Sequence, residues 1–561
     1  MRSRGGWVGP PDAPIAAAWT FPDRAGGPGV VVLPPFGYEL SSTHRTVRRL
    51  AEELADRGCT VLRIDHPCTG DSAGRSADVT LSALRAAVAP AVAALRARGC
   101  ERIVVAGLRL GATIALLEAA AVGADAVVAW VPIASGRRYG REIGLLGARA
   151  PDGVGLPDGT VVAAGTPYPG AFLAELATID LADGQPAAPA PQVLVLDRDD
   201  RATPAAVIEA LTASGAAVTH TSAPGHDRFL DRPAEDAEVA PEPVAVIVDW
   251  VAAHVDGGAA AAADEEVRAA ATIPWDGGAV TETFVTVGDR ELRGVLTSAV
   301  ADARTTLVFF NSGSDPHTGP ARAWVEYARS LALRGGRSDV DVLRVDFTGW
   351  GDSPPDPRAT GRPYDQHTIE DVTSVVDALH AEGRHHVVVA GLCAGAWIAM
   401  AAARTAPIDG LLVLNPQLYW QPGDIIEALM SDTRARRMPE ILEIRDKAAD
   451  GVWDAADAAG ERPPAGEWLD ELAARGVVTS LLFAEGDDGL EYLGDRLGRR
   501  IAELQATGRL RILEMEGVDH GMSRVWLRPQ VIDVIAAELD EQRKPEDQRT
   551  RTASKGTTGP M

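Results

Sequence analysis

The sequence contains little lysine and an excess of acidic side chains. Only three of its 561 residues are lysine, and the 79 acidic residues against 54 basic ones give a formal net charge of −25. Partners such as nucleic acid or an anionic membrane require a basic face. We therefore expect neither, and read the acidic surface as a source of solubility.

Cysteine and long apolar runs are also scarce. The four cysteines, Cys59, Cys68, Cys100 and Cys393, are too few for a disulfide framework, and no spacing in the chain indicates a metal or organic cofactor. The first residues lack the apolar core of a signal peptide, and no uninterrupted apolar run is long enough to cross a bilayer. We expect a reduced, cytoplasmic protein.

The chain carries an internal repeat about half its length. Residues 61–72, VLRIDHPCTGDS, return as VLRVDFTGWGDS at 342–353, and residues 103–116 return at 387–400. A repeat of this length indicates a duplicated domain rather than a solenoid. We predict a first domain over residues 1–254, a linker over 255–272, a second domain over 273–541 and a disordered tail over 542–561.

In each copy, short apolar runs alternate with helical stretches, which is typical of parallel strands joined by crossover helices. We predict an α/β fold with a mostly parallel sheet flanked by helices in each domain. Two antiparallel strands, near Glu282–Val287 and Glu291–Thr297, are expected to precede the second sheet. The first copy shows at most one, around Pro14–Phe21.

The most informative segment is Gly391-Leu392-Cys393-Ala394-Gly395. It follows the apolar run 387–390 and leads into an Ala-rich helical stretch. The pattern G-x-nucleophile-x-G between strand and helix is a nucleophile elbow, which presents its middle side chain at the helix N-terminus. We therefore predict that Cys393 is a nucleophile.

The second copy also supplies a candidate base and a candidate acid in the order that such elbows require. His520 follows the last predicted strand, and Asp487-Asp488 follow the strand before it. Both lie just past the C-terminal end of a strand, where α/β sheets build their sites. We predict a Cys393–His520–Asp487 triad and prefer Asp487 to Asp488 because it comes first in its turn.

Two backbone N–H groups are expected to form an oxyanion hole in the second copy. One belongs to Ala394, the residue after the nucleophile, and the other to Ser312 or Gly313 in the loop after the strand that ends at Phe310. Asp352-Ser353, which recurs as Asp71-Ser72, is expected to close the loop after its strand and is given no catalytic role.

The first copy has an elbow of the same form, Gly107-Leu108-Arg109-Leu110-Gly111, with Arg109 in place of the nucleophile. A guanidinium stays protonated and cannot attack a carbonyl, so this domain is expected to be inactive. Asp200 and His226 occupy the acid and histidine places. Arg109 either binds a carboxylate or phosphate of a ligand or forms an internal ion pair with Asp200; we favour the ion pair.

These elbows, strands and acid–histidine placements resemble the α/β-hydrolase superfamily over nearly the whole chain, twice. The segments LPPFGYE at 33–39 and VLRIDHPCTGDSAG are similar to small bacterial hydrolases encoded beside exosortase and surface-polysaccharide systems. The cysteine elbow resembles those of polyhydroxyalkanoate synthases, dienelactone hydrolases and some cysteine thioesterases. The resemblance implies acyl-thioester or ester chemistry.

The resemblance also implies a lid insertion after the strand that follows each elbow, at Ala134–Pro189 and Gln417–Gly476. Apolar side chains in the second insertion either line an acyl pocket or pack ordinary helices; they are Trp420, Ile425, Ile426, Leu429, Met430 and Trp453.

We predict an acyl-transfer enzyme, a thioesterase, esterase or acyltransferase, in which Cys393 forms a covalent acyl-enzyme. Its substrate is an acyl ester or thioester, with carrier-bound acyl groups among the candidates, and the two domains are expected to contact each other. One alternative is a non-catalytic ligand-binding or scaffold protein. Another is a dienelactone-type lactone hydrolase, whose carboxylate-bearing substrate needs an arginine near the pocket.

Overall fold

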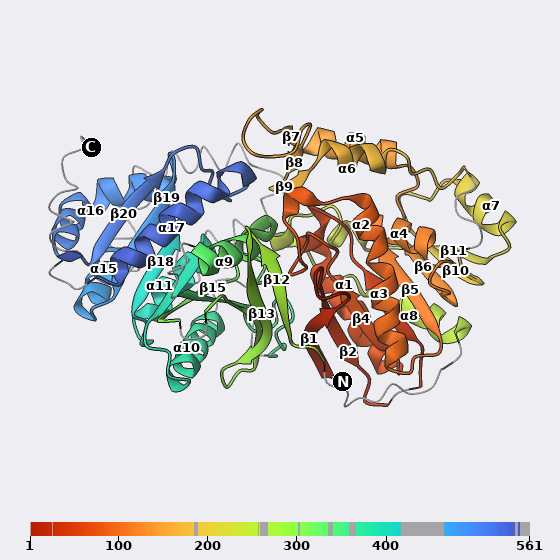
Figure 1. Ribbon diagram of the computed structural model, residues 1–561, viewed down its shortest axis with the longest axis horizontal. Coiled ribbons are helices and arrows are strands. Elements are labelled where there is room, and N and C mark those ends of the chain that lie inside the picture. Colours follow the sequence, from red (N-terminus) through yellow and green to blue (C-terminus); the bar gives the residue numbers. More distant parts are fainter. Residues whose placement is uncertain are drawn as a thin grey trace.

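The computed structural model describes residues 2–24, 26–183, 189–255, 257, 267–300, 303–334, 340–357, 366–416, 465–544 and 548–549. We call residues 2–255 the first half and residues 267–544 the second half. Each half is built around its own β-sheet, and the two sheets lie beside each other with helices on both faces of each (Figure 1).

Within the described residues, eight strands of the first half form a sheet in the order β1-β2-β4-β3-β5-β6-β10-β11. β1 and β2 are antiparallel, β2 is antiparallel to β4, and the pairs from β4 to β11 are parallel. The strands are β1 (Arg2–Val8), β2 (Ile15–Phe21), β3 (Gly29–Leu33), β4 (Thr60–Ile64), β5 (Ile103–Leu108), β6 (Ala126–Trp130), β10 (Gln192–Arg198) and β11 (Ala217–Ala223).

The expectation of at most one leading strand in the first copy was wrong. β1 reads RSRGGWV, which has no apolar alternation, yet it pairs with β2 along its whole length. Its two glycines lie against the second half. A Cβ on Gly5 would be 2.2 Å from the ring of Phe284, and one on Gly6 would be 2.0 Å from Val267. The close approach of the second half therefore explains why this strand lacks the usual pattern.

The second half repeats the same order with one additional edge strand, β12-β13-β14-β16-β15-β17-β18-β19-β20, among the described residues. β12 begins at Ala270, inside the segment predicted to be a linker. The strands are β12 (Ala270–Trp275), β13 (Gly278–Val287), β14 (Leu292–Ser298), β15 (Thr305–Phe310), β16 (Val340–Val345), β17 (Val387–Leu392), β18 (Gly410–Leu414), β19 (Val478–Ala484) and β20 (Leu510–Met515).

The central strands are buried on both faces, as parallel strands between helical layers must be; β5 and β17 have no exposed residue. Separate apolar cores therefore form on the two faces of each sheet. The covering helices of the first half are α1 (Glu39–Asp56), α2 (Leu81–Ala86), α3 (Val88–Ala97), α4 (Leu110–Glu118), α7 (Ala205–Ala213) and α8 (Pro241–His254). Those of the second half are α9 (Ala323–Leu333), α10 (Gln366–Ala381), α11 (Ala394–Ala403), α15 (Ala465–Ala474), α16 (Asp488–Ala506) and α17 (Arg528–Gln542).

An insertion follows β6 in the first half, as predicted. It contains α5 (Gly136–Leu146), the short sheet β7 (Ala148–Arg149), β8 (Val161–Ala163) and β9 (Thr166–Tyr168), and α6 (Gly170–Leu176). This short sheet lies at the boundary between the halves (Figure 1). Residues 417–464 of the second insertion, with all six of its pocket candidates, lie outside the described residues. No helix in the described part of the chain is long and apolar enough to cross a membrane.

The halves meet through reciprocal contacts between equivalent positions. Arg344 of β16 forms an ion pair with Asp71, and Arg63 of β4, 281 positions earlier in the chain, forms one with Asp352. Each arginine and each aspartate has its counterpart in the other half. Two surfaces that contact each other in this reciprocal way behave like the two sides of a symmetric dimer interface.

Two further arginines, again 281 positions apart, extend this reciprocity. Arg48 Nη1 of α1 donates to the carbonyls of Gly351 (2.7 Å) and Ser353 (2.8 Å). Arg329 of α9 donates to the carbonyls of Asp71 (2.5 Å) and Ser72 (3.2 Å). The repeated Asp-Ser loop is therefore held from the opposite half in both copies.

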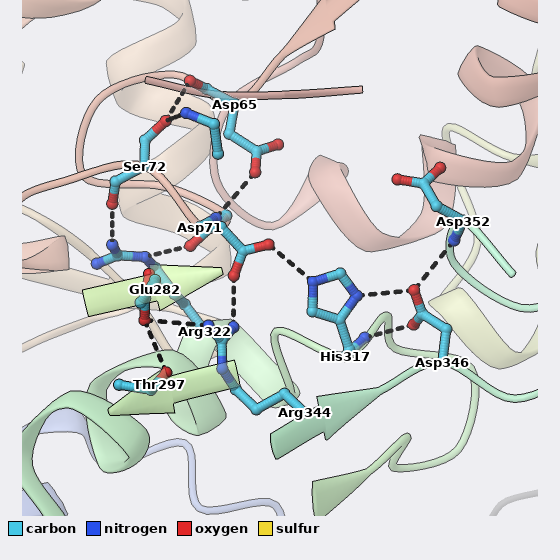
Figure 2. A network of polar contacts seen from close by, with 12 residues as sticks. Asp65, Asp71, Ser72, Glu282, Thr297, His317, Arg322, Arg344, Asp346 and Asp352 are labelled. Carbon is cyan, nitrogen blue, oxygen red and sulfur yellow. Dashed lines mark hydrogen bonds and ion pairs between the residues drawn. The ribbon is translucent and has the colours of Figure 1, made fainter. Parts of the chain in front are cut away.

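His317 lies at the centre of this interface, between a carboxylate of each half (Figure 2). Its Nε2 donates to Asp71 Oδ2 and its Nδ1 to Asp346 Oδ2, both at 2.7 Å. Burial lowers the pKa of His317, but the two aspartates outweigh burial and raise it well above the ordinary value. Glu282, which is fully buried, pairs with Arg329 (2.7 Å) and Arg344 (3.1 Å). The interface is thus a buried network of compensated charges.

Candidate active site

Cys393 sits on a sharp turn between β17 and α11. Its φ is 54°, a left-handed conformation that a residue with a side chain rarely adopts. The two flanking glycines have no room for a side chain, because a Cβ on Gly391 would lie 2.4 Å from Gly395 and one on Gly395 would lie 2.5 Å from Asn311 O. Cys393 is half-buried, whereas the other three cysteines are buried. The predicted elbow is thus present, with its thiol partly exposed.

His520 and Asp487 lie together beside this thiol. His520 Nδ1 is 2.6 Å from Asp487 Oδ2, and Asp487 is held in place because its Oδ1 accepts a hydrogen bond from Gly489 N (2.9 Å) at the start of α16. Hydrogen bonds with Asp487 and then with Cys393 raise the pKa of His520 to about 10. The three side chains are brought together from the ends of β17, β19 and β20. Their roles in catalysis remain predictions.

Asn415, directly after β18, contacts the loop of His520 and was missed by the sequence reading. It is fully buried, with a φ of 47°. Its Nδ2 donates to the carbonyl of His520 (2.8 Å), and its Oδ1 accepts from Ala484 N (2.7 Å) at the end of β19. Asn415 therefore ties the histidine loop to the strand that leads to the acid. The available signal was an asparagine at the end of β18 where the first copy has Val131.

The loop predicted to complete an oxyanion hole lies against the elbow. Gly395 touches Asn311 O, and Gly313 has a φ of 54°. Asn311 fixes this loop because its Nδ2 donates to Asp346 Oδ1 (2.9 Å) and its Oδ1 accepts from Phe347 N (2.6 Å). Ser312 and Ala394 are both buried. The assignment of Ala394, Ser312 and Gly313 as oxyanion donors remains a prediction.

In the first half, Arg109 occupies the elbow with a φ of 56°. It forms an internal ion pair, but the predicted partner was wrong. Its Nε donates to Glu39 Oε1 (2.6 Å), Nη2 lies 3.5 Å from Glu142 Oε2, and Tyr139 donates to the other oxygen of Glu39 (3.1 Å). Burial is the main cause that raises the pKa of Glu39. Sequence reasoning missed Glu39 because this first residue of α1 lies 70 positions from Arg109 in the chain.

Asp200 instead pairs with Arg198, with an Nε–Oδ1 distance of 2.7 Å. His226 is buried; its Nε2 accepts a hydrogen bond from Trp130 Nε1 (2.8 Å), and its Nδ1 donates to Ala223 O (2.9 Å). Burial lowers the pKa of His226. The two residues assigned to the acid and histidine places therefore do not meet, and His226 is a packed core residue.

The strand ends explain the wrong assignment of His226. β11 and β20 each end two residues before a glycine with positive φ, Gly225 and Gly517. His226 follows its glycine at once, whereas His520 is the third residue after its own. Arg228 is the residue of the first half that stands in the place of His520, and it lies 3.5 Å from Glu242. The first half thus carries arginine at the positions equivalent to both Cys393 and His520.

A cavity of about 420 Å³ lies over the first-half elbow, lined by Arg109, Ser135, Arg138, Glu142 and Arg201 among others. Arg201 lies 3.8 Å from Glu142, which also faces Arg109. Arginines and carboxylates are mixed around this cavity. Among the described residues, no group of three or more His, Cys, Asp or Glu side chains is placed to hold a metal ion.

One family model matches part of the second half. Residues 307–533 match the model of the alpha/beta hydrolase family. No curated protein matches this chain. Similar solved structures include Est1E from Butyrivibrio proteoclasticus, with 19% identity over 45% of this chain and 96% of that chain and a TM-score of 0.34. Carboxyl esterase 2 from Tuber melanosporum has 18% identity over 50% of this chain and 88% of that chain, with a TM-score of 0.31. The proline iminopeptidase of Mycobacterium smegmatis has 19% identity over 45% of this chain and 98% of that chain, with a TM-score of 0.32.

Proposed function

We propose that the second half, whose residues 307–533 match the alpha/beta hydrolase family, is an acyl-transfer enzyme with a Cys393–His520–Asp487 triad. The observation that carries this proposal is the hydrogen-bonded chain from Asp487 through His520 toward Cys393 at the elbow. A nucleophile, a base and an orienting acid in this arrangement are the components of covalent acyl transfer.

The reaction would proceed in two steps. The Cys393 sulfur attacks the acyl carbon, a C–S bond forms, and the bond to the leaving alcohol or thiol breaks while His520 donates a proton to that group. Water, an alcohol or an amine then attacks the acyl-thioester, His520 accepts the proton of the attacking group, and the C–S bond breaks to release Cys393. With a pKa raised to about 10, His520 holds its proton at neutral pH and is ready to act as the acid of the first step.

The oxyanion that develops in each step would be bound by backbone N–H groups of Ala394 and of Ser312 or Gly313. Support comes from the close approach of this loop to the elbow, because a Cβ on Gly395 would lie 2.5 Å from Asn311 O and 3.9 Å from Ser312 Cα. Donors fixed in advance in this way stabilise the transition state without having to reorganise.

The test is the rate of iodoacetamide alkylation at Cys393 from about pH 5 to 9, resolved by peptide mass spectrometry. We expect Cys393 to be alkylated faster than a free thiol at neutral pH, and this advantage to be lost in His520→Ala. His254→Ala, which removes an exposed histidine elsewhere, should change nothing. Cys59, Cys68 and Cys100 serve as internal standards, because burial raises the pKa of each.

A panel of acyl esters, acyl-thioesters and lactones, with and without an amine acceptor, then separates hydrolysis from transfer and from lactone opening. An ordinary alkylation profile in both the unaltered protein and His520→Ala would overturn the catalytic proposal. The chain would then be a ligand-binding or scaffold protein.

A further inference from the structure

The hairpin β8–β9 of the first-half insertion ends in a two-residue turn, Ala164-Gly165. Both residues have positive φ, 45° and 76°, as the tight turns that match strand twist require. Ala163 and Thr166 close the hairpin as paired residues. Gly165 is buried although it lies at the tip of a hairpin. Something outside the hairpin therefore covers it.

The covering residues belong to the second half. A Cβ on Gly165 would lie 2.7 Å from Ala321 Cβ, 3.3 Å from Ser523 Cα and 3.5 Å from Ser523 Cβ. Ala321 is itself in a left-handed conformation, with φ 45° and ψ 37°. Its carbonyl accepts a hydrogen bond from Arg528 Nη2 (2.6 Å). Only glycine fits at this tip without displacing backbone.

Ser523 belongs to the loop that carries His520. Ser523 N donates to Asp519 Oδ2 and Arg524 N to Asp519 Oδ1, both at 3.1 Å, and Met522 N donates to Asp519 O (3.0 Å). These bonds close residues 519–524 into one compact turn. A displacement of Ser523 would therefore also displace His520, which follows Asp519 directly in the chain.

The hairpin is anchored in the first half by Tyr168 of β9. Tyr168 is fully buried, its hydroxyl accepts a hydrogen bond from Tyr38 N (3.2 Å), and its ring meets Phe36 edge to face at a centroid distance of 5.5 Å. Gly37 has no room for a side chain against this hydroxyl. The tip thus projects from a rigid base rather than from a free loop.

We propose that the first half positions the histidine of the second half, with Gly165 pressing on Ser523 so that the 519–524 turn holds His520 toward Cys393. This inference rests on the function proposed above. The first half, which lacks a nucleophile, would thereby contribute to the reaction, because its β8–β9 hairpin supports the site of the second half.

The test compares Gly165→Ala with Gly153→Ala. Gly153 lies in the same insertion at a similar φ of 78°, but a Cβ there has nothing within 4 Å. Both variants place a side chain at a positive φ, and only the first meets the second half. We expect kcat/KM for an activated ester to fall about tenfold in Gly165→Ala. We also expect its Cys393 alkylation profile to move toward that of His520→Ala, with Gly153→Ala unchanged in both.

A rescue variant separates the contact from a damaged hairpin. Ala321→Gly removes the atom that a new Cβ at position 165 meets first, so Gly165→Ala/Ala321→Gly should recover most of the lost rate. Equal behaviour of Gly165→Ala and Gly153→Ala would overturn the proposal that Gly165 positions the 519–524 turn.

The alkylation profile also distinguishes the two proposals. If Gly165→Ala shifts the Cys393 profile but the unaltered protein turns over no acyl substrate, the positioning role of Gly165 stands and the proposed function fails. If the unaltered protein hydrolyses esters and Gly165→Ala leaves rate and profile intact, the positioning role alone fails.

Discussion

The two halves share one sheet order and differ where the strands end. β5 with Arg109 and β17 with Cys393 have the same left-handed elbow, and both elbow glycines are too crowded for a side chain. The fold is therefore maintained by buried strands and turn geometry, which the loss of a nucleophile does not disturb. What differs is the set of polar partners above the elbow: a histidine and an aspartate in one half, two glutamates in the other.

The largest expected effect is the loss of the nucleophile. Cys393→Ala should reduce kcat by at least about 10³-fold, because triad members act as a unit. Turnover of an activated ester measures it. Cys100→Ala, a buried cysteine of the first half, is the matched control and should retain activity. Residual turnover near the unaltered level in Cys393→Ala would show that the two halves do not differ in the way described.

Placing a thiol in the first elbow should not restore a site. In Arg109→Cys the new thiol has no histidine partner, so we expect it to alkylate as an ordinary thiol. Glu39, whose side chain is 4% exposed, would lose its cation. We expect a loss of about 3 kcal/mol in the free energy of unfolding, measured by urea denaturation. Arg49→Ala, which breaks an exposed ion pair, should cost less than about 1 kcal/mol. A reactive thiol at position 109 would contradict this prediction.

The shared interface should be sensitive to alkali. His317→Gln removes the cation between Asp71 and Asp346, and we expect a loss of about 2 kcal/mol at pH 6. Because the folded protein raises the pKa of His317, its stabilisation is complete below about pH 6.5 and is lost as pH rises through the raised value. The difference between His317→Gln and the unaltered protein should therefore shrink as the pH is raised through the alkaline range in urea denaturation. A constant difference would show that His317 contributes only as a neutral hydrogen-bonding group.

The smallest expected effect comes from exchanging the residues after β6 and β18. Asn415→Val should lower kcat/KM about tenfold, because the carbonyl of His520 loses its donor. Val131→Asn, the reverse exchange in the first half, should leave activity unchanged. Thermal unfolding of both variants identifies any loss that is merely structural. Equal activity of the two variants would remove Asn415 from the site.

Much of this comparison could be predicted from the sequence, because the buried strands and the elbow glycines have local signatures. The partners of Arg109 and the place of His226 could not. Glu39, the first residue of α1, pairs with Arg109 although it lies 70 positions away in the chain. His226 was misassigned because it lies only two positions from Arg228, the residue equivalent to His520. The prediction for the Asp-Ser loop was correct for one of its two residues. Ser353 closes the loop by donating a hydrogen bond to Asp346 O (2.7 Å), whereas Asp352 forms an ion pair with Arg63 of the other half.

The reciprocal arginine–aspartate pairs have a consequence for the connection between the halves. The reciprocal ion pairs and the His317 contacts are made by residues that lie outside the segment between Val255 and Val267. A covalent connection between two such surfaces raises the effective concentration of one half for the other. We expect a chain cut in that segment to reassemble from two separately produced fragments. The activity of the fragment that carries Cys393 would then measure the binding of the other fragment.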